Sequence, residues 1–497
     1  MVEQIIVSLT HFLPETTLTA AFCLAILSDL LLKKKHLVSA ISIVGVSLAC
    51  YFAIQQFGVS ESIFSGMVVV DPFAVFFKII IAISTLIIIL FSYYSGEVQT
   101  ATKRMGEYFS LLLAMTLGMF LMSGAANLLM MILAMELTSL TSYVLAGYTK
   151  EAPDSSEASL KYIIYGAFSS GLMLYGVSII YGLTGATDIY GINKALSAGS
   201  VGYIPLLVAT ILIVAGFGYK ISAVPFHFWT PDVYEGAPIT ITAFLSVASK
   251  AAGFAMMIRF FKVSFIDSTI TGLPEGMWVS LQGVEWNKLL AILSVLTMTL
   301  GNFVALWQDN MKRLLAYSSI AHAGYMLMGV VVLSDKGIAA VLIYFIVYLF
   351  MNLGAFYVVM LVANKTGKED IDSYKGLGYR TPLMGVAMVI FLISLTGLPP
   401  TAGFIGKLYL FAALLDAKWI WLAVVGALNS VVSLYYYVRI VRNMFLRDPE
   451  ENKEPLVFSR GQVAVLFLLL IPTILFGLYF TPIVDFANAS VLMLGVQ

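Results

Sequence analysis

The middle of the chain reads Gly216-Phe-Gly-Tyr-Lys220-Ile-Ser-Ala-Val-Pro225-Phe-His227-Phe-Trp-Thr-Pro231-Asp-Val-Tyr-Glu-Gly-Ala-Pro238. The strongly apolar segment 204–217 leads into it and places Lys220 five residues before Pro225. Proline lacks a backbone N–H and clashes with the carbonyl four residues back, so Pro225 predicts a broken helix. Irregular backbone at membrane depth is tolerated only where protein buries it or it lines a watery cavity. A lysine beside such a break therefore predicts a polar route through a membrane.

Composition places the whole chain in the membrane. Of its 497 residues, 60% are hydrophobic and 11% are charged, and the mean hydropathy is +0.93. Soluble domains contain about 25% charged residues, so the sequence predicts an all-α polytopic membrane protein. The net charge of zero gives no reason to expect a nucleic-acid partner. Cys23 and Cys50 lack the spacing of a metal site or an iron–sulfur cluster.

The number of membrane spans follows from apolar segments of about 20 residues. Fourteen are found, and the twelfth is interrupted by Leu398-Pro399-Pro400. We expect no soluble catalytic domain, and the sequence has no GxGxxG or Walker motif. The predicted spans are 15–32, 37–56, 73–94, 107–123, 125–147, 158–183, 202–228, 239–261, 289–307, 314–333, 337–363, 382–415, 419–446 and 462–483.

Lysine and arginine mark the cytoplasmic loops, and alternate loops hold most of them. Counting the twelfth segment as two spans would move the last basic loop to the opposite side. We therefore predict one broken span and both termini on the non-cytoplasmic side. The basic loops contain Lys33, Lys34, Lys35, Lys103, Arg104, Lys150, Lys312, Arg313, Lys365, Lys368, Lys375, Arg380, Arg439, Arg442, Arg447, Lys453 and Arg460. The opposite loops contain Lys194, Arg259, Lys262, Lys288, Lys336 and Lys418.

The two broken spans indicate an internal repeat. Pro225 and Pro399 lie 174 residues apart, and segment 133–147 matches segment 315–329 at five of fifteen positions, at an offset of 182. An insertion or deletion of eight residues accounts for the difference. Paired interrupted spans are typical of transporters built from repeats. Spans 4–8 and 9–13 give five helices each, and because five is odd the second repeat is inverted.

This pattern divides the chain into four parts. They are an N-terminal three-helix segment (1–106), a first antiporter-like repeat (107–263), a second repeat (288–447) and a C-terminal helix (460–497).

Four charges are predicted deep in the membrane: Glu136, Lys220, Lys250 and Lys407. Each isolated charge costs about 2.5–3.5 kcal/mol at the bilayer centre. Structural ion pairing is one interpretation, but one glutamate cannot neutralise three lysines, which favours a proton or ion path. A carboxylate that approaches a buried lysine favours its charged form, so movement of Glu136 relative to Lys220 would load or release a proton.

Lys78, like Lys161, lies near a predicted helix end, where it could extend to the headgroups.

Other candidates are weaker. His227 follows the break at Pro225, and His322 lies in the segment that echoes the Glu136 helix; each is a relay residue or a core contact. Glu157 and Lys161 form an i,i+4 pair, which is functional or a plain salt bridge at a helix end.

Three motifs carry a family resemblance. Segment 220–238 resembles a signature of the subunit N family of bacterial NADH-quinone oxidoreductase, respiratory complex I. Met311-Lys-Arg-Leu-Leu-Ala-Tyr-Ser-Ser-Ile-Ala-His-Ala-Gly-Tyr325 and Leu395-Thr-Gly-Leu-Pro-Pro-Thr-Ala-Gly-Phe-Ile-Gly-Lys407 are similar to two more. The resemblance covers nearly the whole chain. It implies an antiporter-like subunit with fourteen helices, broken seventh and twelfth helices and two inverted five-helix repeats.

The resemblance also implies roles. Glu136 would modulate Lys220, Lys250 would be the connecting lysine, and Lys407 would lie nearest the exit. Pro400 doubles the usual helix-breaking proline. The chain itself would bind no cofactor, since NADH or another donor, flavin, iron–sulfur clusters and quinone would belong to other subunits. Partners would be the sister subunit M and small membrane subunits in the inner (cytoplasmic) membrane.

Two rival interpretations stay open. One is a subunit of a multi-subunit Mrp-type cation/proton antiporter, which resembles the same family and needs no electron transfer. The other is a membrane scaffold with vestigial charges. The sequence favours the proton-translocating subunit of a complex driven by redox partners.

Overall fold

A computed structural model describes residues 2–32, 35–101, 105–199, 201–267, 270, 272–281, 285–448 and 454–495. Of the loop residues counted above, Lys33, Lys34, Lys103, Arg104 and Lys453 lie outside the described residues.

Thirteen of the described helices are long and apolar enough to cross a membrane. The broken twelfth span, made of α18 (Pro382–Thr396) and α19 (Ala402–Asp416), completes the predicted fourteen, and the all-α polytopic fold is confirmed. The thirteen are α2 (Leu13–Leu32), α3 (Lys35–Gln55), α4 (Pro72–Tyr94), α6 (Met105–Gly124), α7 (Leu128–Ala146), α8 (Pro153–Thr184), α10 (Tyr203–Ile221), the continuous α12 (Ile239–Phe244), π-helical η1 (Leu245–Ser249) and α13 (Lys250–Ser264), α14 (Trp286–Ala305), α15 (Met311–Val331), α16 (Asp335–Thr366), α20 (Ile420–Leu446) and α21 (Arg460–Leu478).

Short elements connect the spans. A small antiparallel hairpin, β1 (Glu61–Ile63) and β2 (Val68–Val70), pairs Glu61 with Val70 and leads into Asp71, the N-cap of α4. The short helices are α1 (Val2–His11), α5 (Gly96–Ala101), α9 (Ile189–Ser197), α11 (Trp229–Gly236), the 3-10 helix η2 (Ile371–Tyr374), α17 (Leu377–Arg380) and α22 (Thr481–Ala489).

Both predicted breaks lie where proline interrupts a span. α10 ends at Ile221, Ser222 takes a left-handed conformation (φ 62°), and helix resumes in α11 only after Pro225. α18 ends at Thr396, followed by left-handed Gly397 (φ 89°) and the two prolines before α19. Glycine adopts this conformation without the Cβ penalty that other residues meet.

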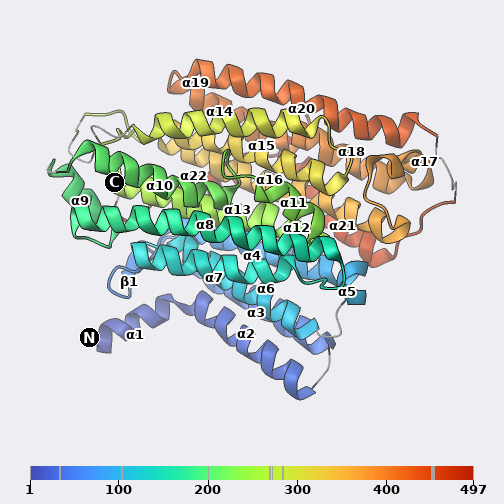
Figure 1. The fold of residues 1–497 in the computed structure, drawn as a ribbon, viewed down its shortest axis with the longest axis horizontal. Coiled ribbons are helices and arrows are strands. Elements are labelled where there is room, and N and C mark those ends of the chain that lie inside the picture. Colours follow the sequence, from blue (N-terminus) through green and yellow to red (C-terminus); the bar gives the residue numbers. More distant parts are fainter. Residues whose placement is uncertain are drawn as a thin grey trace.

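Matching helix caps support the internal repeat. Asn127 caps α7 and bridges to Asp188, while Asn310 caps α15 and bridges to Asp370, so the two sets differ by 182 or 183 residues. The 32-residue helices α8 and α16 also correspond, and each ends at a left-handed glycine, Gly185 or Gly367. The first bridge adjoins α9 and the second precedes α17, and these helices lie at opposite ends of the molecule (Figure 1). The inverted orientation of the two repeats stays a prediction.

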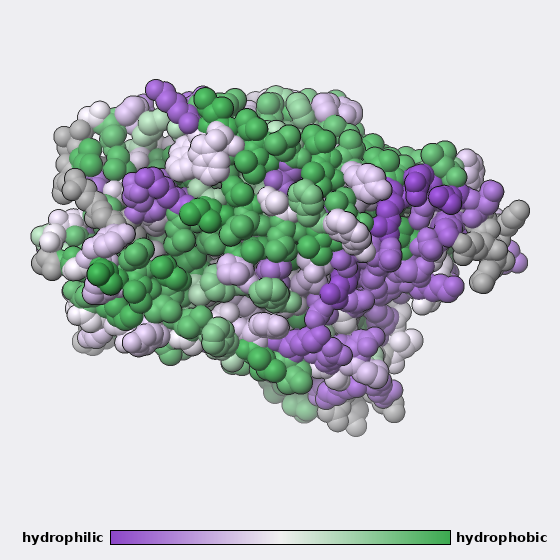
Figure 2. Space-filling model, turned by 45° about the horizontal axis from the view of Figure 1, so that its top comes forward, coloured by the Kyte–Doolittle hydropathy of each residue, from purple (hydrophilic) through white to green (hydrophobic). Residues whose placement is uncertain are grey.

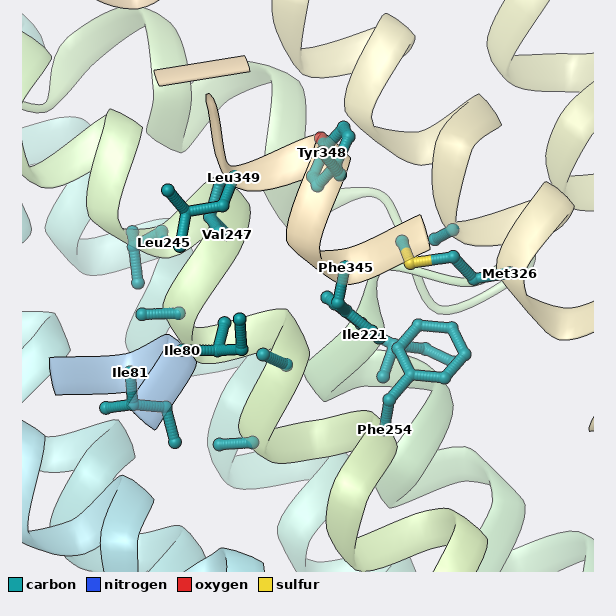
Figure 3. Close-up of a cluster of buried hydrophobic side chains, with 14 of the residues drawn as sticks. Ile80, Ile81, Ile221, Leu245, Val247, Phe254, Met326, Phe345, Tyr348 and Leu349 are labelled. Atoms are coloured by element: carbon teal, nitrogen blue, oxygen red, sulfur yellow. The ribbon is translucent and has the colours of Figure 1, made fainter. Parts of the chain in front are cut away.

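The spans run roughly side by side, with the N-terminal α1 to α3 along one edge and α14, α19 and α20 along the other (Figure 1). α16 lies between them and packs against α4, α15, α18, α19, α21 and α22. Large apolar side chains from several spans fill the centre, among them Ile80 of α4, Phe254 of α13 and Phe345 of α16 (Figure 3). The outer face is largely hydrophobic, and hydrophilic residues gather at one end of the bundle (Figure 2).

Three basic residues lie elsewhere than predicted. Lys78 does not reach the headgroups: it is fully buried on α4 and its Nζ lies 2.5 Å from Glu15 Oε1. Arg259 and Lys262, which we assigned to a loop, are buried within α13. Helix α13 ends at Ser264, past the predicted end of its span at residue 261, and ion pairs with Asp71 and Asp335 compensate the charges of Arg259 and Lys262.

The Arg259 pair is fully satisfied. Its guanidinium binds both carboxylate oxygens of Asp71, at 2.6 and 2.8 Å, and also donates to the Ser123 carbonyl. The backbone N–H groups of Ala74 and Leu494 donate to the same carboxylate. Burial alone would raise the pKa of the Asp71 carboxyl, but the charge and hydrogen bonds of Arg259 hold that pKa below its ordinary value. The pair joins α4, α6, α13 and the C-terminal segment.

Candidate functional site

Lys220 lies on the last turn of α10, beside the break. Its side chain is buried, and its Nζ donates to the Ser139 hydroxyl on α7 at 3.2 Å. Helix α13 approaches closely, because a Cβ added at Gly253 would come 3.1 Å from Lys220 Cγ. The fold thus holds this ammonium group at the junction of α7, α10 and α13.

Glu136 lies one turn before Ser139 on α7 and is partly exposed. Within the described chain its carboxylate makes no hydrogen bond or ion pair, and Lys220 binds Ser139 instead. Glu136 therefore lies one turn of α7 away from Ser139, the residue that binds Lys220 of α10, but it does not contact Lys220. A direct ion pair would require a movement of Glu136 or of the lysine.

Lys250 follows the π-helical turn η1, one turn before Gly253 on the same helix. Its buried Nζ donates to the backbone carbonyl of Ser319 at 2.8 Å and to the Ser319 hydroxyl at 2.6 Å. The Ser249 hydroxyl beside it is buried and has no hydrogen-bond partner in the described part of the chain. Single π-helical turns are frequent at functional sites. Here the turn directly precedes Lys250, whose side chain binds α15.

Helix α15 carries a polar face that continues from Lys250. Ser318, His322 and Tyr325 recur at helical spacing. The buried His322 ring contacts the Tyr344 hydroxyl through Nδ1 at 2.7 Å and the Tyr437 hydroxyl through Nε2 at 3.4 Å. Tyr437 in turn contacts the Ser318 hydroxyl at 2.5 Å. His322 is therefore hydrogen-bonded at both ring nitrogens within a network of hydroxyl groups.

Lys407 ends this sequence of groups. Its Nζ donates to the Thr396 carbonyl at 2.8 Å and to the Ser430 hydroxyl at 3.0 Å, and it lies 4.4 Å from the Tyr325 ring centroid. Thr396 is the last residue of α18, whose C-terminus carries partial negative charge. The second break therefore supplies an acceptor that stabilises the ammonium group.

The remaining candidates lie apart from this line. Lys161 pairs with Glu157 at 2.7 Å and with Asp232 of α11 at 2.7 Å, and Arg313 binds Asp232 and Glu235. These side chains line an open cavity of about 260 Å³. His227 is buried in the first break, and its Nδ1 has no hydrogen-bond partner among the described residues.

The sequence reasoning missed the acceptors. It named the three lysines, but not Ser139, Ser319 or Thr396, which bind them. A weak signal existed, since small hydroxyl residues recur in these apolar helices. The second partner of Lys161 was hidden, because Asp232 is 71 residues away.

Together these groups form a buried polar line from α7 through α10, α13 and α15 to α19. The sequence that contains this polar line is similar to known proteins. The family model of the transmembrane part of NADH:quinone oxidoreductase and Mrp antiporters matches residues 125–433. A NADH-quinone oxidoreductase subunit N 2 of Chloroherpeton thalassium is 51% identical over 97% of this chain and 94% of its own length. The chain belongs to the subunit N family of NADH-quinone oxidoreductase.

Solved structures agree with the family. A chain of respiratory complex I from Thermus thermophilus has a TM-score of 0.78 and 29% identity, covering 96% of this chain and 99% of that one. A chain of the Mrp complex from Dietzia has a TM-score of 0.83 at 20% identity, covering 97% of each chain. The Mrp likeness shows the fold alone. Within the described residues, no group of three or more His, Cys, Asp or Glu side chains is placed to bind a metal.

Proposed function

We propose that the chain translocates protons as the subunit N of a NADH-quinone oxidoreductase, along a relay formed by Glu136, Lys220, Lys250 and Lys407. The buried line carries this proposal, because each lysine ends on a neutral acceptor rather than on a carboxylate. A buried lysine without a paired carboxylate gives up its proton readily. Each can therefore pass between charged and neutral forms.

The steps follow the geometry. Glu136 favours a charged Lys220 when it approaches, and its withdrawal releases the proton toward Lys250, whose helix packs against the Lys220 stem. From Lys250 the route follows Ser319, the His322 network and Tyr325 to Lys407. His322 relays the proton through its two hydrogen-bonded nitrogens. The Glu157–Lys161 cluster supports the helix ends at the first break rather than the relay.

Membership of the subunit N family also supports a proposal for the partners, the membrane and the cofactors. The chain assembles with the sister subunit M and small membrane subunits of the inner membrane, with both termini on the non-cytoplasmic side. It binds no cofactor itself, and electron transfer from the donor to quinone occurs in other subunits. The repeats 107–263 and 288–447 each supply one broken helix, flanked by the segments 1–106 and 460–497.

Purification of the tagged chain in mild detergent, with mass spectrometry of its partners, tests this assignment. Recovery with iron–sulfur and quinone-site subunits supports it. Recovery with small membrane subunits alone, together with sodium-dependent proton transport and no redox centre, contradicts it and supports an Mrp-type antiporter.

A further inference from the structure

A second pair of buried charges lies outside the relay. Glu15 of α2 and Lys78 of α4 approach to 2.5 Å, and both side chains are completely buried. Apart from this ion pair, neither carboxylate oxygen nor the ammonium group has a hydrogen-bond partner among the described residues. The pair lies about 9 Å from the start of α4, since Lys78 is its seventh residue and each residue rises 1.5 Å.

The Asp71–Arg259 pair provides the comparison within the same chain. It is equally buried, but its geometry is bidentate, and two backbone N–H groups and a carbonyl satisfy the remaining polar atoms. A buried ion pair compensates its desolvation only when further hydrogen bonds complete it. Asp71–Arg259 meets that condition and Glu15–Lys78 does not. The Glu15–Lys78 pair therefore relies on a single ion-pair contact to offset the desolvation of both charges.

Polar groups continue along α4 from this pair. Lys78, Thr85 and Ser92 recur every seven residues, which places them on one face of the helix, about 10.5 Å apart. The Thr85 hydroxyl contacts Thr116 at 3.1 Å, and Ser92 contacts Tyr108 at 2.8 Å. All four hydroxyl-bearing side chains are buried.

We call Lys78, Thr85, Ser92 and their partners Thr116 and Tyr108 the polar file. This file reaches the opposite end of α4. The Tyr108 hydroxyl contacts Thr240 at 2.9 Å, and the adjacent Ile239 N–H donates to the partly exposed Glu97 carboxylate at 2.9 Å. Each step of about 10.5 Å along the helix axis is longer than a direct hydrogen bond, so proton movement between these groups requires water or side-chain motion. A carboxylate thus stands at each end of a buried polar file.

An apolar layer separates this file from the central lysines. Ile80 follows Lys78 by two positions and so lies on the opposite side of α4. Figure 3 draws Ile80 in one buried cluster with Leu245, Phe254 and Phe345, and α4 packs against η1, α13 and α16. The file and the relay therefore occupy different sides of α4.

We propose that Glu15–Lys78 is a second proton-exchange site, connected through Thr85, Ser92, Tyr108 and Thr240 toward the end of α4 where Glu97 lies. In the resting pair Lys78 is charged and Glu15 is a carboxylate. A proton arriving from one end is taken up by Glu15, and Lys78 then releases its own proton toward the other end. The proton on Glu15 then passes to the neutral Lys78 and restores the resting pair. One proton enters and one leaves in each cycle, and no bond other than N–H and O–H changes. The proposal rests on the proposed function only in that redox partners drive the movement.

The test uses the whole complex in liposomes, with electron transfer and proton uptake measured together. The double variant Glu15→Gln/Lys78→Met removes both charges while preserving side-chain size. We expect fewer protons per electron, with electron transfer and assembly retained, and loss of a carboxyl C=O band from the redox-induced infrared difference spectrum. The matched control is Glu285→Gln/Lys288→Met, an ion pair whose side chains are 60% and 62% exposed. The control should keep both the ratio and the band.

An unchanged ratio together with an unchanged infrared spectrum would overturn the proposal and leave a structural ion pair. If the double variant does not assemble, Thr85→Val decides, because it removes one hydroxyl and neither charge. A lower ratio in Thr85→Val supports the file, and a wild-type ratio contradicts it. Lys220→Ala, measured in parallel, separates the two proposals. If Lys220→Ala keeps the wild-type ratio and the Glu15/Lys78 variant does not, the relay proposal is contradicted, and the Glu15 infrared band still tests the second site.

Discussion

At the scale of single residues, glycine at 397 is fitted to Lys407. A Cβ at this position would lie 2.6 Å from Lys407 Cδ, and φ is 89°. We predict that Gly397→Ala moves Lys407 off the Thr396 carbonyl, destabilises the protein by about 1–3 kcal/mol and lowers the proton-to-electron ratio. The control is Gly182→Ala, because nothing lies within 4 Å of a Cβ there. Equal ratios in the two variants would contradict this role of Gly397.

The Asp71–Arg259 pair gives a second prediction at this scale. Arg259→Met leaves a buried carboxylate without its partner, so we expect a loss of about 3–5 kcal/mol of stability, seen as a lower unfolding temperature. The exposed variant Lys288→Met should change stability by less than about 1 kcal/mol. Similar unfolding temperatures for both variants would contradict a stabilising role of the pair.

At the scale of elements, the first broken helix depends on the left-handed Ser222. β-branched residues are strained in that conformation, whereas glycine adopts it freely. We predict that Ser222→Val costs about 1–3 kcal/mol and slows pumping, because it displaces the end of α10 that carries Lys220. Ser222→Gly should retain pumping. If the valine variant matched the glycine variant, the turn at 222 would not set the position of Lys220.

At the scale of elements, the sequence predicts the spans and their interruptions but not the local backbone conformation. Pro225 and Pro399 locate both interruptions, and hydropathy gives fourteen spans, because each signal is local in the chain. The left-handed residues that end α10 and α18 were not predicted. Neither was the π-helical turn before Lys250, which reflects packing of α13 against several helices.

At the scale of the whole molecule, long-range pairing limited the sequence analysis. The partners of Lys78, Arg259 and Lys262 are 63, 188 and 73 residues away, so no local pattern joins them. The charges of the relay were visible because each stands alone in an apolar segment. The acceptors that hold them come from other helices and became visible only in the fold.

The whole molecule is also the scale at which proton movement is measured. If the lysines form one line, replacing any of them should lower the proton-to-electron ratio rather than stop electron transfer. The double variant Lys220→Met/Lys407→Met should then lower the ratio no further than the more severe single variant, because changes within one pathway are not additive. Independent, additive losses would indicate two separate routes.

The most direct measurement is the number of protons moved per electron by the purified complex in liposomes, compared between Lys220→Met and the wild type. Methionine keeps the apolar stem beside Gly253 and removes only the charge. The relay predicts continued electron transfer with a lower ratio in the variant. An unchanged ratio at full electron transfer would contradict it.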